Sequence, residues 1–196
     1  RGVWGRFAVF AFLILLCWGV GQAKRDKWPH EQSSLEPDAN IVWGNLDNGF
    51  RYALMPHDVK PGLVSMRFMV NVGALDEEDE ERGLAHFIEH MAFNGTKNFK
   101  KNELVDYLES TGTKFGADLN AYTSFDETVY MLQVRTDDEE QMRKGFLVLE
   151  DWAGGLTFDN EEIDKERGVV ESEWRSRLSP DQRMQNRYFP IMYKDS

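Results

Sequence analysis

Alternation of apolar and polar residues predicts strands in the first half of the chain. Residues 41–46 and 50–55 flank Asp47-Asn48-Gly49, and Asn-Gly is typical of a tight hairpin turn. Residues 63–72 alternate as well, so a third strand is expected there. Its apolar face would be formed by Val64, Met66, Phe68, Val70 and Val72.

Helical spacing and capping residues predict the elements that follow. Two further strands are expected over 115–122 and 128–135. Helices are expected over a segment containing 86–90 and closed by Gly95, from Asn102 to Gly112, over 138–153, and from Asp159 to Leu178. In the third of these helices, Met142, Phe146, Leu149 and Ala153 are at helical spacing. Strands mixed with helices in this order predict an α+β fold, with helices packed on one face of a largely antiparallel or mixed sheet.

The overall composition is that of a globular protein. Hydrophobic residues make up 41% of the chain and charged residues 29%, which argues against disorder. The formal net charge of −11 argues against a nucleic-acid partner, because nucleic-acid binding requires a basic face. An acidic run over 76–81 is expected to be a solvated loop.

The first 23 residues differ from the rest. Arg1 and Arg6 precede an uncharged apolar run over 7–20, and Gly21-Gln22-Ala23 places small residues where signal peptidase cleaves. Residues 1–23 are therefore predicted to be a signal peptide, and the protein to be exported, periplasmic or secreted. The run is shorter than the roughly 20 residues of a spanning helix, so an uncleaved membrane anchor is the less favoured alternative. Residues 24–40 are polar and are predicted to be a linker.

Cysteine chemistry is excluded from the mature chain. Cys17 is the only cysteine, and it lies within the predicted signal peptide. Disulfides, thiol nucleophiles and thiolate metal ligands are therefore not expected. A metal site would have to use His, Asp and Glu.

The strongest chemical motif is HFIEH, residues 86–90. On a helix, His90 lies about 40° from His86, and Glu89 about 60° to the other side, so the three side chains share one face. Two imidazoles at this spacing are a common helical pair of zinc ligands. Glu89 would lie beside the metal, where a metal-bound water would be, and is the expected general base. The alternative is a pair of core histidines beside a surface glutamate.

The opposite face of this helix is apolar and is expected to be buried. It consists of Leu84, Phe87, Ile88 and Met91. The histidine face would then belong to a helix that is packed into the protein.

A catalytic zinc ion needs a third protein ligand. Of the four histidines, His30 and His57 remain, and both are expected at the surface. On the helix from Asp159, Glu166 and Glu173 lie within an apolar arc, where a carboxylate is costly unless it is paired or bound to metal. That arc consists of Ile163, Val169, Val170 and Trp174. One glutamate would bind the metal and the other would orient a histidine. Alternatively, both would pair with arginines at the edge of the helix: Arg167, Arg175 or Arg177.

These residues resemble those of the pitrilysin/insulinase family of zinc metallopeptidases, and most of all its periplasmic PqqL-type members. The resemblance covers residues 45–193 and rests on NLDNGFRYAL, GLAHFIEHMAFNGTKNF, FGADLNAYTSFDETVY and ERGVVESEWRSRL. It implies the fold of the processing-peptidase and LuxS-like metallohydrolase domains. It also implies one bound zinc ion and hydrolysis of peptides.

The resemblance assigns roles to individual residues. His86 and His90 match the zinc histidines, and Glu89 matches the general base. Glu173 matches the third zinc ligand and Glu166 a residue that supports the site, although the family's histidine-to-glutamate spacing taken alone would select Glu166. An edge strand containing Asn120 and Ala121 would bind the substrate backbone by strand addition, and the same stretch is also consistent with an ordinary core hairpin.

Family members close two or more related domains around a peptide. Residues 41–196 are therefore expected to be an N-terminal zinc peptidase domain, truncated at its C-terminal end, with a second homologous half supplied by the same longer chain or by a partner subunit. The expected activity is a zinc metalloendopeptidase acting on small or unfolded peptides. The alternative is a non-catalytic domain that binds peptides or scaffolds a partner half, and inactive relatives of that kind are expected to lack one of the histidines or Glu89. A thiol-assisted metal lyase is excluded by the cysteine content.

Overall fold

The computed structural model describes residues 27–101, 103–110, 116 and 119–194. The predicted signal peptide, 1–23, lies outside these residues. No helix in the described part of the chain is both long and apolar enough to cross a membrane. The chain divides into two compact units, Arg1–Pro61 and Gly62–Ser196.

The first unit contains the predicted hairpin. Strands β1 (Val42–Asn45) and β2 (Arg51–Leu54) pair antiparallel in a two-stranded sheet of their own. Gly49 has a φ of 89° in the turn, a conformation that glycine adopts without steric cost. The predicted linker contains a short 3₁₀ helix, η1 (Pro29–Gln32).

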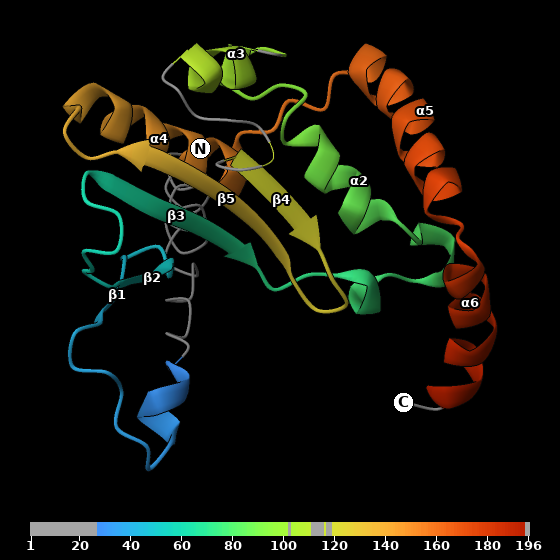
Figure 1. The fold of residues 1–196 in the computed structure, drawn as a ribbon, viewed down its shortest axis with the longest axis horizontal. Coiled ribbons are helices and arrows are strands. Elements are labelled where there is room, and N and C mark those ends of the chain that lie inside the picture. Colours follow the sequence, from blue (N-terminus) through green and yellow to red (C-terminus); the bar gives the residue numbers. More distant parts are fainter. Residues whose placement is uncertain (1–26, 102, 111–115, 117–118, 195–196) are drawn as a thin grey trace, which may run out of the picture. The chain divides into compact units, whose positions relative to one another are not determined.

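The second unit is built on a three-stranded antiparallel sheet. Its strands are β3 (Leu63–Val70), β4 (Leu119–Thr123) and β5 (Thr128–Arg135), in the spatial order β3-β5-β4 (Figure 1). The predicted alternation is confirmed over β3, where the even-numbered apolar residues are buried or half-buried and the odd-numbered residues are exposed. Val72, predicted to lie on the same apolar face, lies beyond the end of the strand and is 44% exposed. Strand β4 lies at an edge of this sheet.

Five α-helices accompany this sheet in the described residues: α2 (Leu84–Met91), α3 (Glu103–Ser110), α4 (Glu139–Gly154), α5 (Asn160–Arg177) and α6 (Pro180–Met192). Two short 3₁₀ turns, η2 (Ala74–Asp76) and η3 (Asp79–Glu81), precede α2. Asp138 and Asp159 accept backbone hydrogen bonds at the starts of α4 and α5, as N-cap residues do. The α+β prediction is confirmed, while α6 was not predicted.

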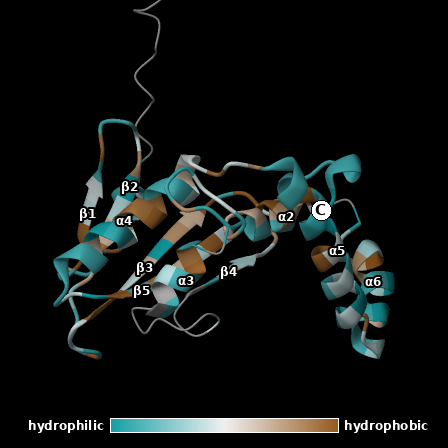
Figure 2. Ribbon diagram, turned by 90° about the horizontal axis from the view of Figure 1, so that it is seen from above, coloured by the Kyte–Doolittle hydropathy of each residue, from teal (hydrophilic) through white to brown (hydrophobic). Residues whose placement is uncertain are grey.

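The core lies between the sheet and the helices. Leu132 of β5 is fully buried and packs with Val148 and Trp152 of α4. The Trp152 indole N–H donates to the carbonyl of Ala92, just beyond α2, at 3.2 Å, so it fixes α4 to the end of the helix that carries the histidines. Figure 2 shows that hydrophobic residues predominate along β3, whereas α5 and α6 mix polar and apolar residues along their lengths.

Of the apolar residues predicted at helical spacing in α4, Met142 and Leu149 are half-buried and pack against the core. Gly145, Val148, Asp151 and Trp152 are buried, whereas Phe146 is 57% exposed. Asp151 belongs to this buried face, at about 240° when Gly145 is set at 0° and Val148 lies at about 300°. Its carboxylate accepts hydrogen bonds from the Thr96 hydroxyl at 2.5 Å and the Asn98 side chain at 2.7 Å. A ranking by hydrophobicity does not select a carboxylate, so it misses this side of the helix.

The predicted apolar arc of α5 is only partly shielded: Ile163 and Val170 are half-buried. Val169 and Trp174 are 51% and 59% exposed, and no residue of α5 is fully buried. This helix contacts α2, and the side chains of Glu166 and Glu173, which reach the histidines of α2, are only 12% and 24% exposed. The apolar side of α2 is likewise less buried than expected: Met91 is buried but Leu84 is 46% exposed, and Glu89 is among the buried residues of this helix.

Candidate metal centre

Helix α2 lies between strand β4 and helix α5 and contacts both (Figure 1). It begins after Gly83, which has a φ of 91° and no side chain with which to cap the helix. Glu77 performs this role from the preceding acidic run: its carboxylate accepts the backbone N–H groups of Gly83 at 2.8 Å and Ala85 at 2.7 Å. A negative charge is favourable at a helix N-terminus. Part of the run expected to be a solvated loop therefore fixes the start of this helix.

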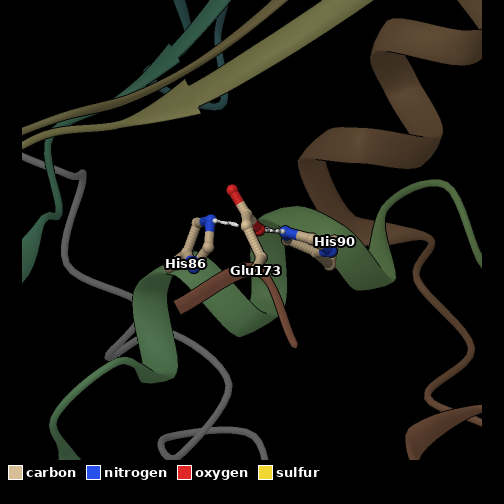
Figure 3. Close-up of side chains that lie close together, drawn as sticks. All are labelled: His86, His90 and Glu173. Carbon is tan, nitrogen blue, oxygen red and sulfur yellow. Dashed lines mark hydrogen bonds and ion pairs between the residues drawn. The ribbon is translucent and has the colours of Figure 1, made fainter. Parts of the chain in front are cut away.

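Three ligand atoms from α2 and α5 come together at one point (Figure 3). Nε2 of His86 lies 3.3 Å from Nε2 of His90. Oε2 of Glu173 lies 3.6 Å from the first nitrogen and 3.1 Å from the second. A tetrahedral zinc site with bonds of about 2.0–2.1 Å requires ligand atoms about 3.3 Å apart. The three side chains therefore have the spacing of a zinc site.

The hydrogen bonding of the Glu173 carboxylate also supports a metal site. Its Oε1 pairs with Arg177, whereas Oε2 is buried and has no hydrogen-bond donor among the described residues. A buried carboxylate oxygen without a donor is costly. A divalent cation between Oε2 and the two ring nitrogens would satisfy it, and imidazole nitrogen with carboxylate oxygen is a donor set that zinc accepts.

Glu166 contacts the other side of His90. Its Oε1 lies 2.7 Å from Nδ1 of His90, and its Oε2 accepts the side-chain amide of Asn94 at 2.7 Å. A carboxylate accepts only, so Nδ1 carries the proton and Nε2 keeps its lone pair towards His86 and Glu173. This is the arrangement in which a carboxylate orients a metal-binding histidine.

Asn94 was missed in the sequence. Its side chain also lies 3.2 Å from the carbonyl oxygen of His90. It follows His90 by one helical turn, so its position on the histidine face could have been found from the spacing. By contrast, His30 and His57 are not among the residues that could hold this metal in the described part of the chain.

Glu89 is buried beside the histidine pair, with 8% exposure. Its Oε2 accepts the hydroxyl of Thr123, on β4, at 2.6 Å. The negative charge of Glu89 also acts on Tyr130: burial, and then this charge, raise the pKa of Tyr130 to about 12. The phenol therefore stays protonated throughout the physiological range.

A cavity of about 620 Å³ joins these groups to the edge of the sheet. Its lining includes His86, Glu89, His90, Glu173, Asn120 and Ala121. Strand β4 pairs with β5 on one side, through Asn120 with Met131 and Ala121 with Tyr130. The backbone N–H of Ala121 donates to the Asn120 side chain at 2.9 Å.

The model of the family described as Insulinase (Peptidase family M16) matches residues 52–192. The chain belongs to this family. Curated relatives include the probable zinc protease PqqL of Escherichia coli K12, 42% identical over 144 residues, and a zinc protease PQQL-like of Arabidopsis thaliana, 34% identical over 164 residues. These matches cover 74% and 84% of this chain but only 16% and 17% of the relatives, so the chain spans about a sixth of their length.

Solved structures of relatives agree with the fold. The first half of the periplasmic protease PqqL from Escherichia coli superposes with a TM-score of 0.79 at 38% identity, covering 84% of this chain and 35% of that one. A ferredoxin protease, FusC, gives a TM-score of 0.71 at 29% identity, covering 80% of this chain and 17% of that one. The family and fold expected from the motifs are confirmed.

Proposed function

We propose that this chain is the N-terminal zinc-binding part of a metalloendopeptidase that hydrolyses small or unfolded peptides. The observation that carries the proposal is the spacing of three atoms, Nε2 of His86, Nε2 of His90 and Oε2 of Glu173, at 3.1–3.6 Å from one another. His86, His90 and Glu173 are proposed as the ligands of one zinc ion. Glu166 is proposed to orient His90.

Glu89 is proposed as the general base. Zinc, when bound, acts as a Lewis acid and lowers the pKa of a coordinated water to about 7. Glu89 shares the cavity with the three ligands, so its carboxylate can take the proton of the attacking water and deliver it to the leaving amine. Its low exposure keeps bulk water away from that carboxylate.

Asn120 and Ala121 are proposed to bind the substrate backbone. They lie on the free edge of the sheet and line the cavity that contains the metal ligands. An extended peptide would add to β4 as a further strand. The backbone N–H of Ala121, which here donates a hydrogen bond to the Asn120 side chain, would then donate to a carbonyl oxygen of the substrate instead. Backbone recognition of this kind tolerates many side chains.

The longer protein is proposed to supply the rest of the active site. A second homologous half, in the same chain or in a partner subunit, would close over the cavity and complete the binding of the peptide. Export is proposed from the predicted signal peptide at 1–23, with 24–40 as a linker and 41–196 as part of the peptidase domain. The solved PqqL structure is described as a periplasmic protease, which agrees with this localisation.

The test is Glu89→Gln in the full-length protein. Gln keeps the size of the side chain but cannot take a proton, so zinc content should be unchanged while peptide hydrolysis falls by at least a hundredfold. Glu171→Gln is the matched control, because Glu171 is exposed on α5 and pairs with Arg175. Activity of Glu89→Gln within tenfold of the unsubstituted protein, or loss of its zinc, would contradict the assignment.

A further inference from the structure

The hydroxyl of Thr123 holds the carboxylate of Glu89. The distance of 2.6 Å between Oγ1 of Thr123 and Oε2 of Glu89 is that of a charge-assisted O–H···O⁻ hydrogen bond. An ionised carboxylate can only accept, so the threonine hydroxyl is the donor. The two residues lie on different elements, the edge strand β4 and helix α2.

Thr123 is held in place by the end of the β4–β5 hairpin. It lies opposite Thr128 in the register, and the Thr128 hydroxyl is 3.0 Å from the carbonyl of Val72 and 3.3 Å from Oγ1 of Thr123. The carbonyl oxygens of Ser124 and Phe125 accept the N–H groups of Ala74 and Leu75, at 3.0 and 2.8 Å. The hairpin is thus fixed to the segment that follows β3.

Gly73 shows how closely these segments approach. A Cβ at this position would lie 2.5 Å from the carbonyl oxygen of Ser124 and 2.6 Å from Phe125 backbone atoms. Both neighbours are backbone, so they cannot move aside as the end of a flexible side chain could. Thr123 therefore extends from a fixed support, which is the condition for holding another side chain in one geometry.

We infer that Thr123 is a positioning residue for Glu89: it binds Oε2 and so leaves Oε1 as the oxygen that handles the proton. This inference rests on the proposed function, because it gives Glu89 the role of general base. A base that rotates freely spends part of its time out of reach of the water, and a misplacement of about 1 Å can cost on the order of a hundredfold in rate. Thr123 is not one of the proposed metal ligands, so removal of its hydroxyl should affect the rate and leave the metal in place.

The kinetic test uses full-length protein loaded with zinc. Thr123→Val keeps the shape of the side chain and removes the donor, so kcat should fall by roughly ten- to a hundredfold, with KM within about threefold. Thr123→Ser restores the hydroxyl and should recover most of kcat. Thr136→Val is the control for the same change at an exposed threonine. Unchanged kcat in Thr123→Val, a loss confined to KM, or failure of Thr123→Ser to recover would overturn the inference.

A second readout does not depend on activity. Crystal structures of the same variants should show Glu89 displaced in Thr123→Val and in its original position in Thr123→Ser, with zinc affinity within about threefold in both. Glu89 in place without the hydroxyl would overturn the inference. If the unsubstituted protein cleaves no peptide, the proposed function fails, and this comparison still decides whether Thr123 positions Glu89.

Discussion

Replacing Glu166 with Gln tests the arrangement behind His90. The carboxylate of Glu166 serves two donors: Oε1 lies 2.7 Å from Nδ1 of His90, and Oε2 accepts from Asn94 at 2.7 Å. A glutamine has one acceptor oxygen and one NH₂ group. Whichever way its amide is turned, an N–H group must face either the ring of His90 or the amide of Asn94.

The size of the effect follows from this mismatch. One of two hydrogen bonds is replaced by a contact between two donors, and the negative charge beside the imidazole is lost. Changes to residues that orient a metal ligand reduce metal affinity by about 10–100-fold, which corresponds to about 1.4–2.7 kcal/mol. Glu173→Gln should cost more than this, because it replaces a charged ligand oxygen.

The assay is a competition between the full-length protein and a chelator of known zinc affinity. The unsubstituted protein, Glu166→Gln, Glu173→Gln and the control Glu171→Gln are compared at one pH. The expected order of zinc affinity is unsubstituted and Glu171→Gln, then Glu166→Gln, then Glu173→Gln. The orienting role of Glu166 is wrong if Glu166→Gln loses as much zinc affinity as Glu173→Gln, or if it loses less than about twofold.

Two further predictions concern the surroundings of the site. Glu77→Ala removes both hydrogen bonds at the start of α2 and should lower the free energy of unfolding, measured by chemical denaturation, by about 0.5–2 kcal/mol. Glu80→Ala changes an exposed residue of the same acidic run and should have little effect. Equal effects of the two substitutions would show that Glu77 does not cap the helix. The raised pKa of Tyr130 favours the neutral phenol in the folded state, so the stability it contributes is complete below about pH 10 and is lost as the pH rises towards 12. Tyr130→Phe should remove this part of the alkaline loss, and identical unfolding profiles of the two proteins between pH 8 and 11.5 would contradict the shift.

The features that follow from periodicity were predictable. The i, i+3, i+4 spacing places His86, Glu89 and His90 on one side of a helix whatever that helix packs against. The alternation of β3 likewise fixes its two faces, and Asp159 identifies the start of α5 through its side chain alone. In each case the pattern is local, so residues close in sequence carry all the information.

The features that depend on packing were not predictable from pattern. The buried face of α4 includes Asp151, whose burial is compensated by donors more than fifty residues away. Trp174 is apolar yet exposed, because α5 contacts α2 along one side. The hydrogen bond between Thr123 and Glu89 joins a strand to a helix, and no sequence pattern around either residue predicts the other as its partner. Tertiary contacts decide burial at all of these positions.

The choice between Glu166 and Glu173 as the proposed third ligand shows the same division. Periodicity selected Glu166 and Glu173 together, since they share a side of α5, and could not choose between them. Two helical turns separate them, about 11 Å along the axis, so one ion cannot be bound directly by both. The structure places Oε2 of Glu173 near Nε2 of both histidines and Oε1 of Glu166 at Nδ1 of His90.

A crystal structure of the full-length protein, with anomalous diffraction measured at the zinc absorption edge, would show directly whether His86, His90 and Glu173 bind zinc. We expect one zinc ion, bound within about 2.0–2.2 Å by Nε2 of His86, Nε2 of His90 and an oxygen of Glu173, with Glu166 hydrogen-bonded to His90. A zinc ion bound to Glu166 and remote from Glu173, or a folded protein that binds no zinc when supplied with it, would show that these ligands are wrongly assigned.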